Sequence, residues 1–149
     1  MAEFSQFTIT DAAYEAATRF VEEKWFDSAN EAGKFAAAYA IRCHFDEIDP
    51  GSLYYPGSTH NYGYSSFDSD GSWETIIKTL YNTETPRAYF RNLIIWGLED
   101  MGRRIQESGV LQITDFLSSS PARCNSRQTF SQLSRAGRSS AVRMISVNP

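Results

Sequence analysis

The sequence predicts a mainly α-helical domain of about four principal helices in one bundle, and it leaves room for one short strand at the N-terminus. Three observations favour this fold class. Apolar residues recur at helical spacing in four separate segments, capping residues precede several of these segments, and strand-like alternation stands out at the N-terminus. With 149 residues and a hydrophobic content of 42%, the chain is long enough to form one domain with a conventional core.

The first element is a short alternating segment at residues 4–10. Its apolar residues are Phe7 and Ile9, and the polar Gln6, Thr8 and Thr10 alternate with them, which is the period of a β-strand. The same pattern is compatible with a loop. We therefore expect either a short strand or an extended loop before the first helix.

The first two helices are predicted at residues 11–24 and 29–44. Thr10 or Asp11 can cap the first helix, and Ser28 with Glu31 has the spacing of a capping box at the start of the second. The second helix is apolar on nearly all sides, with Lys34 as one of its few polar residues, so we expect it to be buried.

Residues 45–72 are rich in Gly, Ser, Asp and Tyr, and they predict a long ordered loop. Loops of this length are uncommon unless they have a function. Rigid aromatic rings give a partner contact area at little entropic cost, although the same rings can instead cover the core of the domain itself. An acidic stretch, residues 68–71, favours an Asx turn over a calcium loop. The candidate partner-binding residues are Tyr54, Tyr55, Tyr62 and Tyr64.

Two further helices are predicted, one beginning near Ser72 and one running from Pro86 to about Ser108. The first of these places five large apolar residues on one face, and the second has a proline at its first helical position. Arginines on the outer surface of the last helix have acidic neighbours and indicate an ordinary solvated face: Arg87, Arg91, Arg103 and Arg104.

Charge divides the chain into a helical domain, residues 1–117, and a tail, residues 118–149. The first part holds all 18 acidic residues and nine basic ones, whereas the tail is rich in serine and has five arginines and no acidic residue. We expect the tail to be disordered. It is a phosphate-contacting arm, a solvated tail, or a segment that is not the natural end of the domain. Its candidate nucleic-acid-binding residues are Arg123, Arg127, Arg135, Arg138 and Arg143.

Residue patterns with catalytic or metal-binding chemistry are weak in this chain. Cys43, His44, His60 and Cys124 are the only soft metal ligands, and their spacing does not suit a zinc site. Cys43 with His60 could form a thiol–imidazole pair, but Cys43 continues the apolar face of its helix, which is typical of a buried, inert cysteine. We expect no cofactor, no metal and no enzymatic activity.

Two family resemblances concern the residues described above. The order strand, helix, turn, helix over residues 4–44 resembles a ribbon-helix-helix unit, in which two chains pair their strands and outward side chains read DNA. That resemblance implies DNA contacts from Gln6, Thr8 and Thr10. Residues 26–28, 34–41, Trp73 and 95–99 resemble small accessory proteins of bacterial DNA phosphorothioation (Dnd) defence systems, over roughly residues 4–107. This second resemblance implies a non-catalytic component that acts with larger proteins on DNA.

Taken together, these features predict a non-catalytic interaction module with a protein partner. A ribbon-type DNA-binding regulator is the first alternative and an enzyme the second. If the chain forms a homodimer, the best interface candidates are Phe7 with Ile9, or Trp25 with Phe26. No apolar run is long enough for a membrane helix, and the first residues do not form a secretory signal, so we expect a cytoplasmic protein without a membrane partner.

Overall fold

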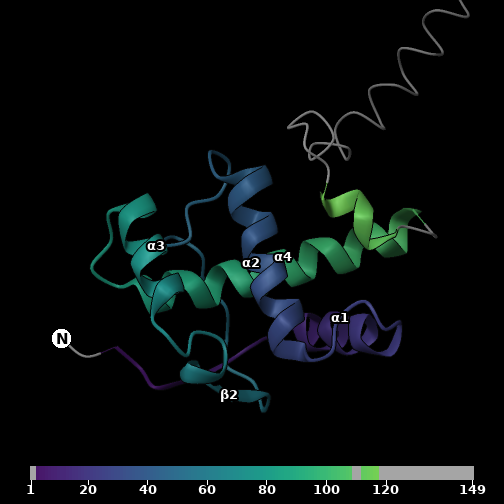
Figure 1. Ribbon diagram of the computed structural model, residues 1–149, viewed down its shortest axis with the longest axis horizontal. Helices are drawn as coiled ribbons and strands as arrows, with labels where there is room; N and C mark the ends of the chain where they lie inside the picture. Colours follow the sequence, from purple (N-terminus) through teal and green to yellow (C-terminus); the bar gives the residue numbers. More distant parts are fainter. Residues whose placement is uncertain (1–2, 109–111, 118–149) are drawn as a thin grey trace, which may run out of the picture. The chain divides into compact units, whose positions relative to one another are not determined.

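Four α-helices and one two-stranded sheet are present in the computed structural model, which describes residues 3–108 and 112–117 (Figure 1). The mainly helical class is confirmed, and the helix ends lie close to those predicted. In chain order the elements are β1 (Gln6–Thr8), α1 (Asp11–Glu22), α2 (Ala29–His44), β2 (Asn61–Gly63), the short 3-10 helix η1 (Tyr64–Ser66), α3 (Ser72–Tyr81), α4 (Pro86–Ser108) and the 3-10 helix η2 (Ile113–Leu117).

Contacts within the chain divide it into two units, Met1–Ile113 and Thr114–Pro149. The four α-helices and the sheet all belong to the first unit. In the second unit, the structure describes residues 114–117. The predicted tail, residues 118–149, lies outside the described residues, and so do its arginines Arg123, Arg127, Arg135, Arg138 and Arg143.

Helix α4 is the element on which the other three helices pack (Figure 1). Two glycines of α4 permit the close approach. A Cβ atom on Gly97 would lie 2.2 Å from the carbonyl oxygen of Ala36 on α2, and one on Gly102 would lie 3.0 Å from the Cβ of Ala16 on α1. Small side chains on both helices at these crossings allow the two backbones to come close together. The contact is then packed with little empty space, as protein interiors generally are.

Ser28 caps the start of helix α2, as predicted, but the capping box is only half formed. The Ser28 Oγ accepts a hydrogen bond from the backbone N–H of Glu31 (3.3 Å), whereas the Glu31 carboxylate pairs with Lys34 at 2.7 Å. The helix is buried on the sides that face α1 and α4, while Ala38 and Arg42 are exposed. The sequence predicted that α2 is buried on nearly all sides, and this is not observed.

The predicted N-terminal strand exists, and it pairs antiparallel with a second strand, β2, which lies in a segment expected to be a loop. β2 has three residues, one of them a glycine, so it is too short to show a periodic pattern. The paired residues are Gln6 with Gly63, Phe7 with Tyr62, and Thr8 with Asn61.

The other side of the N-terminal segment is covered by α4. Arg87 donates from Nη1 to the carbonyl oxygen of Phe4 (3.0 Å), and Arg91 donates from Nε to the carbonyl oxygen of Thr8 (2.8 Å). β1 thus pairs with β2 along one edge and accepts a hydrogen bond from α4 at Thr8 on the other, all within the same chain. This arrangement differs from the ribbon-helix-helix unit, in which the strand pairs with a second chain.

Apolar residues proposed for a homodimer interface are partly used by the chain's own core. Phe7 and Ile9 are 5% and 2% exposed, so they are not available to a second chain. The alternation of apolar and polar residues in this strand therefore reflects the burial of Phe7 and Ile9 in the core of the same chain. Trp25 and Phe26 are half-buried, and the ring of Trp25 stacks on Phe20 in α1 at a centroid distance of 5.5 Å.

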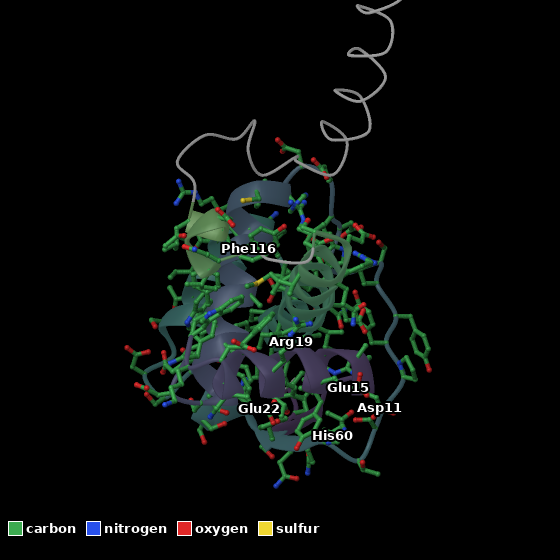
Figure 2. The ribbon with its side chains drawn as sticks, turned by 90° about the vertical axis from the view of Figure 1, so that its right-hand side faces the viewer. Asp11, Glu15, Arg19, Glu22, His60 and Phe116 are labelled. Carbon is green, nitrogen blue, oxygen red and sulfur yellow. The ribbon has the colours of Figure 1, made fainter. Side chains whose placement is uncertain are left out.

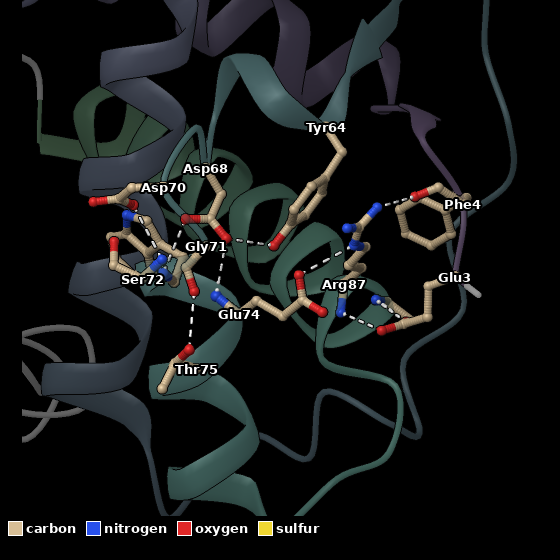
Figure 3. A network of polar contacts seen from close by, with 12 residues as sticks. Glu3, Phe4, Tyr64, Asp68, Asp70, Gly71, Ser72, Glu74, Thr75 and Arg87 are labelled. Carbon is tan, nitrogen blue, oxygen red and sulfur yellow. Dashed lines mark hydrogen bonds and ion pairs between the residues drawn. The ribbon is translucent and has the colours of Figure 1, made fainter. Parts of the chain in front are cut away.

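Asp68 fixes the start of α3 (Figure 3). Its two carboxylate oxygens accept hydrogen bonds from the backbone N–H groups of Trp73 and Glu74, both at 3.0 Å. Asp70 accepts from the backbone N–H of Ser72 (3.0 Å), which confirms the predicted Asx turn. These hydrogen bonds satisfy N–H groups that the first helical turn leaves free.

The start of α4 is capped from the far N-terminus of the chain. The Glu3 carboxylate accepts hydrogen bonds from the backbone N–H groups of Arg87 (3.0 Å) and Ala88 (3.1 Å), as Figure 3 shows for Arg87. The side chain of Arg87 also pairs with Glu74 at 3.3 Å. Because Glu3 is more than eighty residues away in sequence, no local pattern could predict this cap.

Candidate interaction surface

The loop between α2 and β2, residues 45–60, is held by a buried asparagine of α4. Asn92 donates hydrogen bonds from Nδ2 to the carbonyl oxygens of Pro50 (2.8 Å) and Leu53 (3.1 Å). A buried amide NH2 group whose acceptors are two backbone oxygens fixes the path of that backbone. The loop is therefore fixed to α4 immediately before Tyr54.

The preceding residue of α4, Arg91, fixes the other side of the same position. Arg91 donates from Nη2 to the carbonyl oxygen of Tyr55 (3.2 Å), while its Nε holds β1 at Thr8. Between these two attachments the side chain of Tyr54 is 87% exposed. The loop thus presents one aromatic ring to solvent on a backbone that is anchored on both sides.

A tight turn and a close packing contact order the first part of the loop. Asp49 accepts hydrogen bonds from the backbone N–H of Gly51 (3.1 Å) and from the Ser52 hydroxyl, through its side chain and its carbonyl oxygen respectively. A Cβ atom on Gly51 would lie 2.4 Å from the hydroxyl oxygen of Tyr89 on α4. A larger residue here would require the Tyr89 ring to shift, because the backbone approaches this ring so closely.

Ser58 attaches the end of the loop to the chain segment between β1 and α1. Its hydroxyl donates to the carbonyl oxygen of Ile9 and accepts from the backbone N–H of His60 (3.1 Å). Its own backbone N–H donates to the Thr8 hydroxyl oxygen (3.3 Å). The loop is thus ordered from end to end by side chains rather than by regular secondary structure.

The other three candidate tyrosines are less accessible than predicted. Tyr55 is half-buried, and burial raises the pKa of its hydroxyl to about 12. Tyr62 is half-buried as well, and burial raises its pKa. Tyr64 is buried: its hydroxyl donates to Asp68 (3.0 Å), and the guanidinium of Arg87 lies 4.4 Å from its ring centroid. These three rings cover the protein's own core.

Gln6, Thr8 and Thr10 do not form a free row of polar side chains. Gln6 accepts a hydrogen bond from the side chain of Asn61 (3.0 Å), and Thr8 accepts one from the loop backbone. Thr10 caps α1 and donates to the carboxylate of Glu99 (2.6 Å). The structure gives each of these side chains an intramolecular partner in place of the DNA base that the ribbon-helix-helix resemblance implies.

The structure gives Cys43 and His60 separate partners. His60 lies beside the start of α1 (Figure 2), where its Nε2 is 3.2 Å from the Asp11 carboxylate and its ring stacks on Tyr14 at a centroid distance of 3.7 Å. Cys43 is half-buried in the last turn of α2 and is disulfide-bonded, so it is not the buried free thiol that the sequence predicted.

The arginines of α4 do not form the predicted solvated face. Arg104 is buried, Arg87 and Arg91 are half-buried, and only Arg103 is exposed. The guanidinium groups lie against the domain and donate hydrogen bonds to backbone carbonyl oxygens or to carboxylates. Long aliphatic stems allow this placement, because they can be buried while the charged end finds polar partners.

A buried polar network that the sequence did not predict lies between α2 and α4. Asp100 accepts hydrogen bonds from the Tyr39 hydroxyl (2.7 Å), from Arg104 (2.9 Å) and from Arg103 (2.8 Å). Burial alone raises the pKa of Asp100, but hydrogen bonds from Tyr39 and Arg103 and the charge of Arg104 outweigh burial and lower it. Burial raises the pKa of Tyr39 well above its usual value.

His44 extends this network toward the surface. Its Nε2 lies 3.4 Å from an Nη of Arg104, and its Nδ1 lies 2.9 Å from the Glu47 carboxylate. The same Nε2 also lies 3.3 Å from the hydroxyl oxygen of Tyr39, so the imidazole contacts both Tyr39 and Arg104. The arrangement satisfies buried polar groups and joins two helices. The spacing of Asp100 and Arg104 was the one local signal for it.

Among the described residues, no group of three histidine, cysteine, aspartate or glutamate side chains is arranged to hold a metal ion. In the same part of the chain, no helix combines the length and the apolar character that crossing a membrane requires. Comparison of the chain with known protein families, characterised proteins and solved structures finds no match.

Proposed function

We propose that this protein is a non-catalytic interaction module and that Tyr54 is the centre of its docking surface for a protein partner. The observation that carries the proposal is the attachment of the loop on both sides of Tyr54. Asn92 holds the carbonyl oxygen of Leu53, Arg91 holds that of Tyr55, and the ring between them is 87% exposed.

This geometry favours binding because it lowers the entropic cost of association. A partner that docks on a mobile loop must order its backbone, whereas the backbone around Tyr54 is already ordered by α4. Tyrosine is also one of the residue types that contribute most to protein interfaces, because its ring offers a large contact area with few rotatable bonds. An isolated exposed ring gains contact area when a partner covers it.

The resemblance to Dnd accessory proteins supplies the biological setting of the proposal. In that setting the partner is a larger protein of a defence system linked to DNA modification. We do not propose a ribbon-type DNA-binding regulator, because β1 pairs with β2 of the same chain and both of its edges have partners. We do not propose an enzyme, because Cys43 is disulfide-bonded and His60 has Asp11 and Tyr14 as its neighbours.

Site-specific photo-crosslinking in the organism that encodes the chain tests this proposal. A photoreactive phenylalanine analogue replaces Tyr54 in one variant and the exposed Thr79 of α3 in a matched control. We expect a discrete crosslinked protein from position 54 that is missing from position 79. Crosslinking that is absent at both positions, or equal at both, would contradict the proposal.

A further inference from the structure

We infer that the partner binds through an acidic peptide segment and that a carboxylate of this segment pairs with Arg91 next to Tyr54. This inference rests on the proposed function and adds the chemistry of the partner. Arg91 differs from the other arginines of α4, Arg87, Arg103 and Arg104, in the kind of group that accepts its hydrogen bonds.

Arg91 donates hydrogen bonds only to uncharged acceptors in the described part of the chain. They are the carbonyl oxygens of Thr8 (2.8 Å) and Tyr55 (3.2 Å) and the side-chain oxygen of Asn92 (3.3 Å). A guanidinium group carries five N–H donors, so two remain after these three bonds. The side chain is half-buried, and part of it therefore stays open to solvent.

The other three arginines of α4 each have a carboxylate partner. Arg87 pairs with Glu74 at 3.3 Å, and Arg103 and Arg104 both pair with Asp100, at 2.8 and 2.9 Å. No carboxylate of the described residues lies within ion-pair distance of Arg91. This is so although acidic residues are twice as numerous as basic ones in residues 1–117.

This unneutralised charge favours an anionic partner for a physical reason. Partial burial takes a cation out of water, and neutral acceptors return only part of the lost hydration. The effect is visible in Arg91 itself, since burial lowers its pKa. A carboxylate from a partner would supply the missing charge and accept from the remaining N–H donors, and arginine–carboxylate bonds are among the strongest in proteins.

The rest of the molecule argues for a peptide carboxylate rather than the phosphates of a nucleic acid. A polyanion would meet the excess acidic residues of residues 1–117, whose field repels it. A short segment with one or two carboxylates avoids most of this repulsion. Tyr54 would then contribute the apolar contact and Arg91 the charged contact, which are two of the commonest anchors in protein interfaces.

Selection from a random twelve-residue peptide phage library tests the inference with the full-length protein as bait. Binders that no longer recognise Tyr54→Ala are kept and sequenced. We expect these peptides to share an aspartate or glutamate whose replacement by the corresponding amide weakens binding at least about tenfold. The change is made in the peptide, so the folding of the protein does not affect this result.

Two protein variants separate charge pairing from loop attachment. Arg91→Gln removes the charge, a loop contact and the hydrogen bond to Thr8, whereas Asn92→Ala removes loop contacts and leaves the charge. We expect Arg91→Gln to lose at least about tenfold in affinity for the selected peptides and to abolish their salt dependence, and Asn92→Ala to keep that dependence. Circular dichroism checks that both variants are folded.

The outcomes distinguish the inference from the proposed function. Tyr54-dependent peptides without a shared acidic residue, or with equal affinity for Arg91→Gln, overturn the inference alone. A library without any Tyr54-dependent binder overturns both. Binding of a duplex oligonucleotide that is lost in Arg91→Gln, or self-association that is lost in the same variant, would also overturn it, because Arg91 would then serve a phosphate or a second copy of the chain.

Discussion

Tyr39 on α2 donates a 2.7 Å hydrogen bond to the buried carboxylate of Asp100 on α4. The bond joins two helices whose backbones lie close together at Ala36 and Gly97. It also completes the set of donors around a carboxylate that is 4% exposed. The α2–α4 contact is therefore held by a polar network as well as by small apolar residues.

Replacing Tyr39 with phenylalanine should destabilise the protein by about 1–2 kcal/mol, because Asp100 loses one of its buried donors and the ring volume is unchanged. Urea denaturation measures this change in the free energy of unfolding. Tyr14→Phe is the matched control, since its ring is partly exposed and should tolerate the loss of the hydroxyl. Equal stabilities of the two variants would show that the buried bond contributes nothing.

Asp100 should make the protein sensitive to acid. Its pKa is lower in the folded state than in the unfolded state. The group therefore contributes stability above the unfolded pKa of about 4, and this stability is lost as the pH falls through the lower folded pKa. Asp100→Asn should cost about 3 kcal/mol at pH 7, because Arg104 loses its buried counter-charge.

Urea denaturation of both proteins at pH 7 and at pH 3 checks this expectation. The difference in unfolding free energy between the two pH values should be smaller in Asp100→Asn than in the parent. Replacement of the exposed Asp27 by asparagine controls for the general effect of removing a carboxylate. An Asp100→Asn protein with the parent's pH dependence would mean that this carboxylate does not carry the acid sensitivity.

Gly97→Ala should destabilise the protein by about 2–3 kcal/mol even though alanine is the better helix former. The added Cβ would lie 2.2 Å from the carbonyl oxygen of Ala36, which is backbone and cannot rotate away. The control is Gly63→Ala, where a Cβ meets nothing within 4 Å and the change should stay within about 0.5 kcal/mol. Thermal unfolding followed by circular dichroism compares them, and a Gly97→Ala protein as stable as the control would refute the packing argument.

Asn92→Ala should loosen the loop that carries Tyr54. Two hydrogen bonds to the loop backbone disappear, so amide hydrogen exchange in residues 51–57 should become faster by about tenfold or more. Mass spectrometry after hydrogen exchange measures the effect. Asn61→Ala is the control, because that side chain makes one exposed hydrogen bond to Gln6. Unchanged exchange in the Asn92 variant would mean that the loop is ordered by its other contacts.

The helices of this protein were predictable because each carries its own signals. Thr10 and Ser28 cap α1 and α2 as expected, and Pro86 opens α4. The apolar spacing of α3 correctly predicted a helix but not its exposure. Ile76 and Leu80 are 46% and 45% exposed, because α3 has its main helix contact with α4.

The candidate site was only partly predictable. The loop composition indicated a tyrosine-rich surface, and Tyr54 is indeed exposed, but nothing local separated it from the buried Tyr64. That difference depends on which ring faces Asp68 and Arg87 and which one points to solvent. The roles of Arg91 and Asn92 depend on backbone carbonyls that lie far away in sequence and carry no residue-specific signal.

Local sequence signals were sufficient to predict the helical class, the number of helices and most of their ends, since capping and apolar periodicity act within a few residues. Three features depend on how the chain folds in space. β1 pairs with β2, Glu3 caps α4, and the Asp100 carboxylate accepts hydrogen bonds from three side chains. Each of these contacts joins side chains or backbone groups whose meeting depends on how the helices pack. Local preference cannot specify such contacts, because their free energy arises only when distant segments come together.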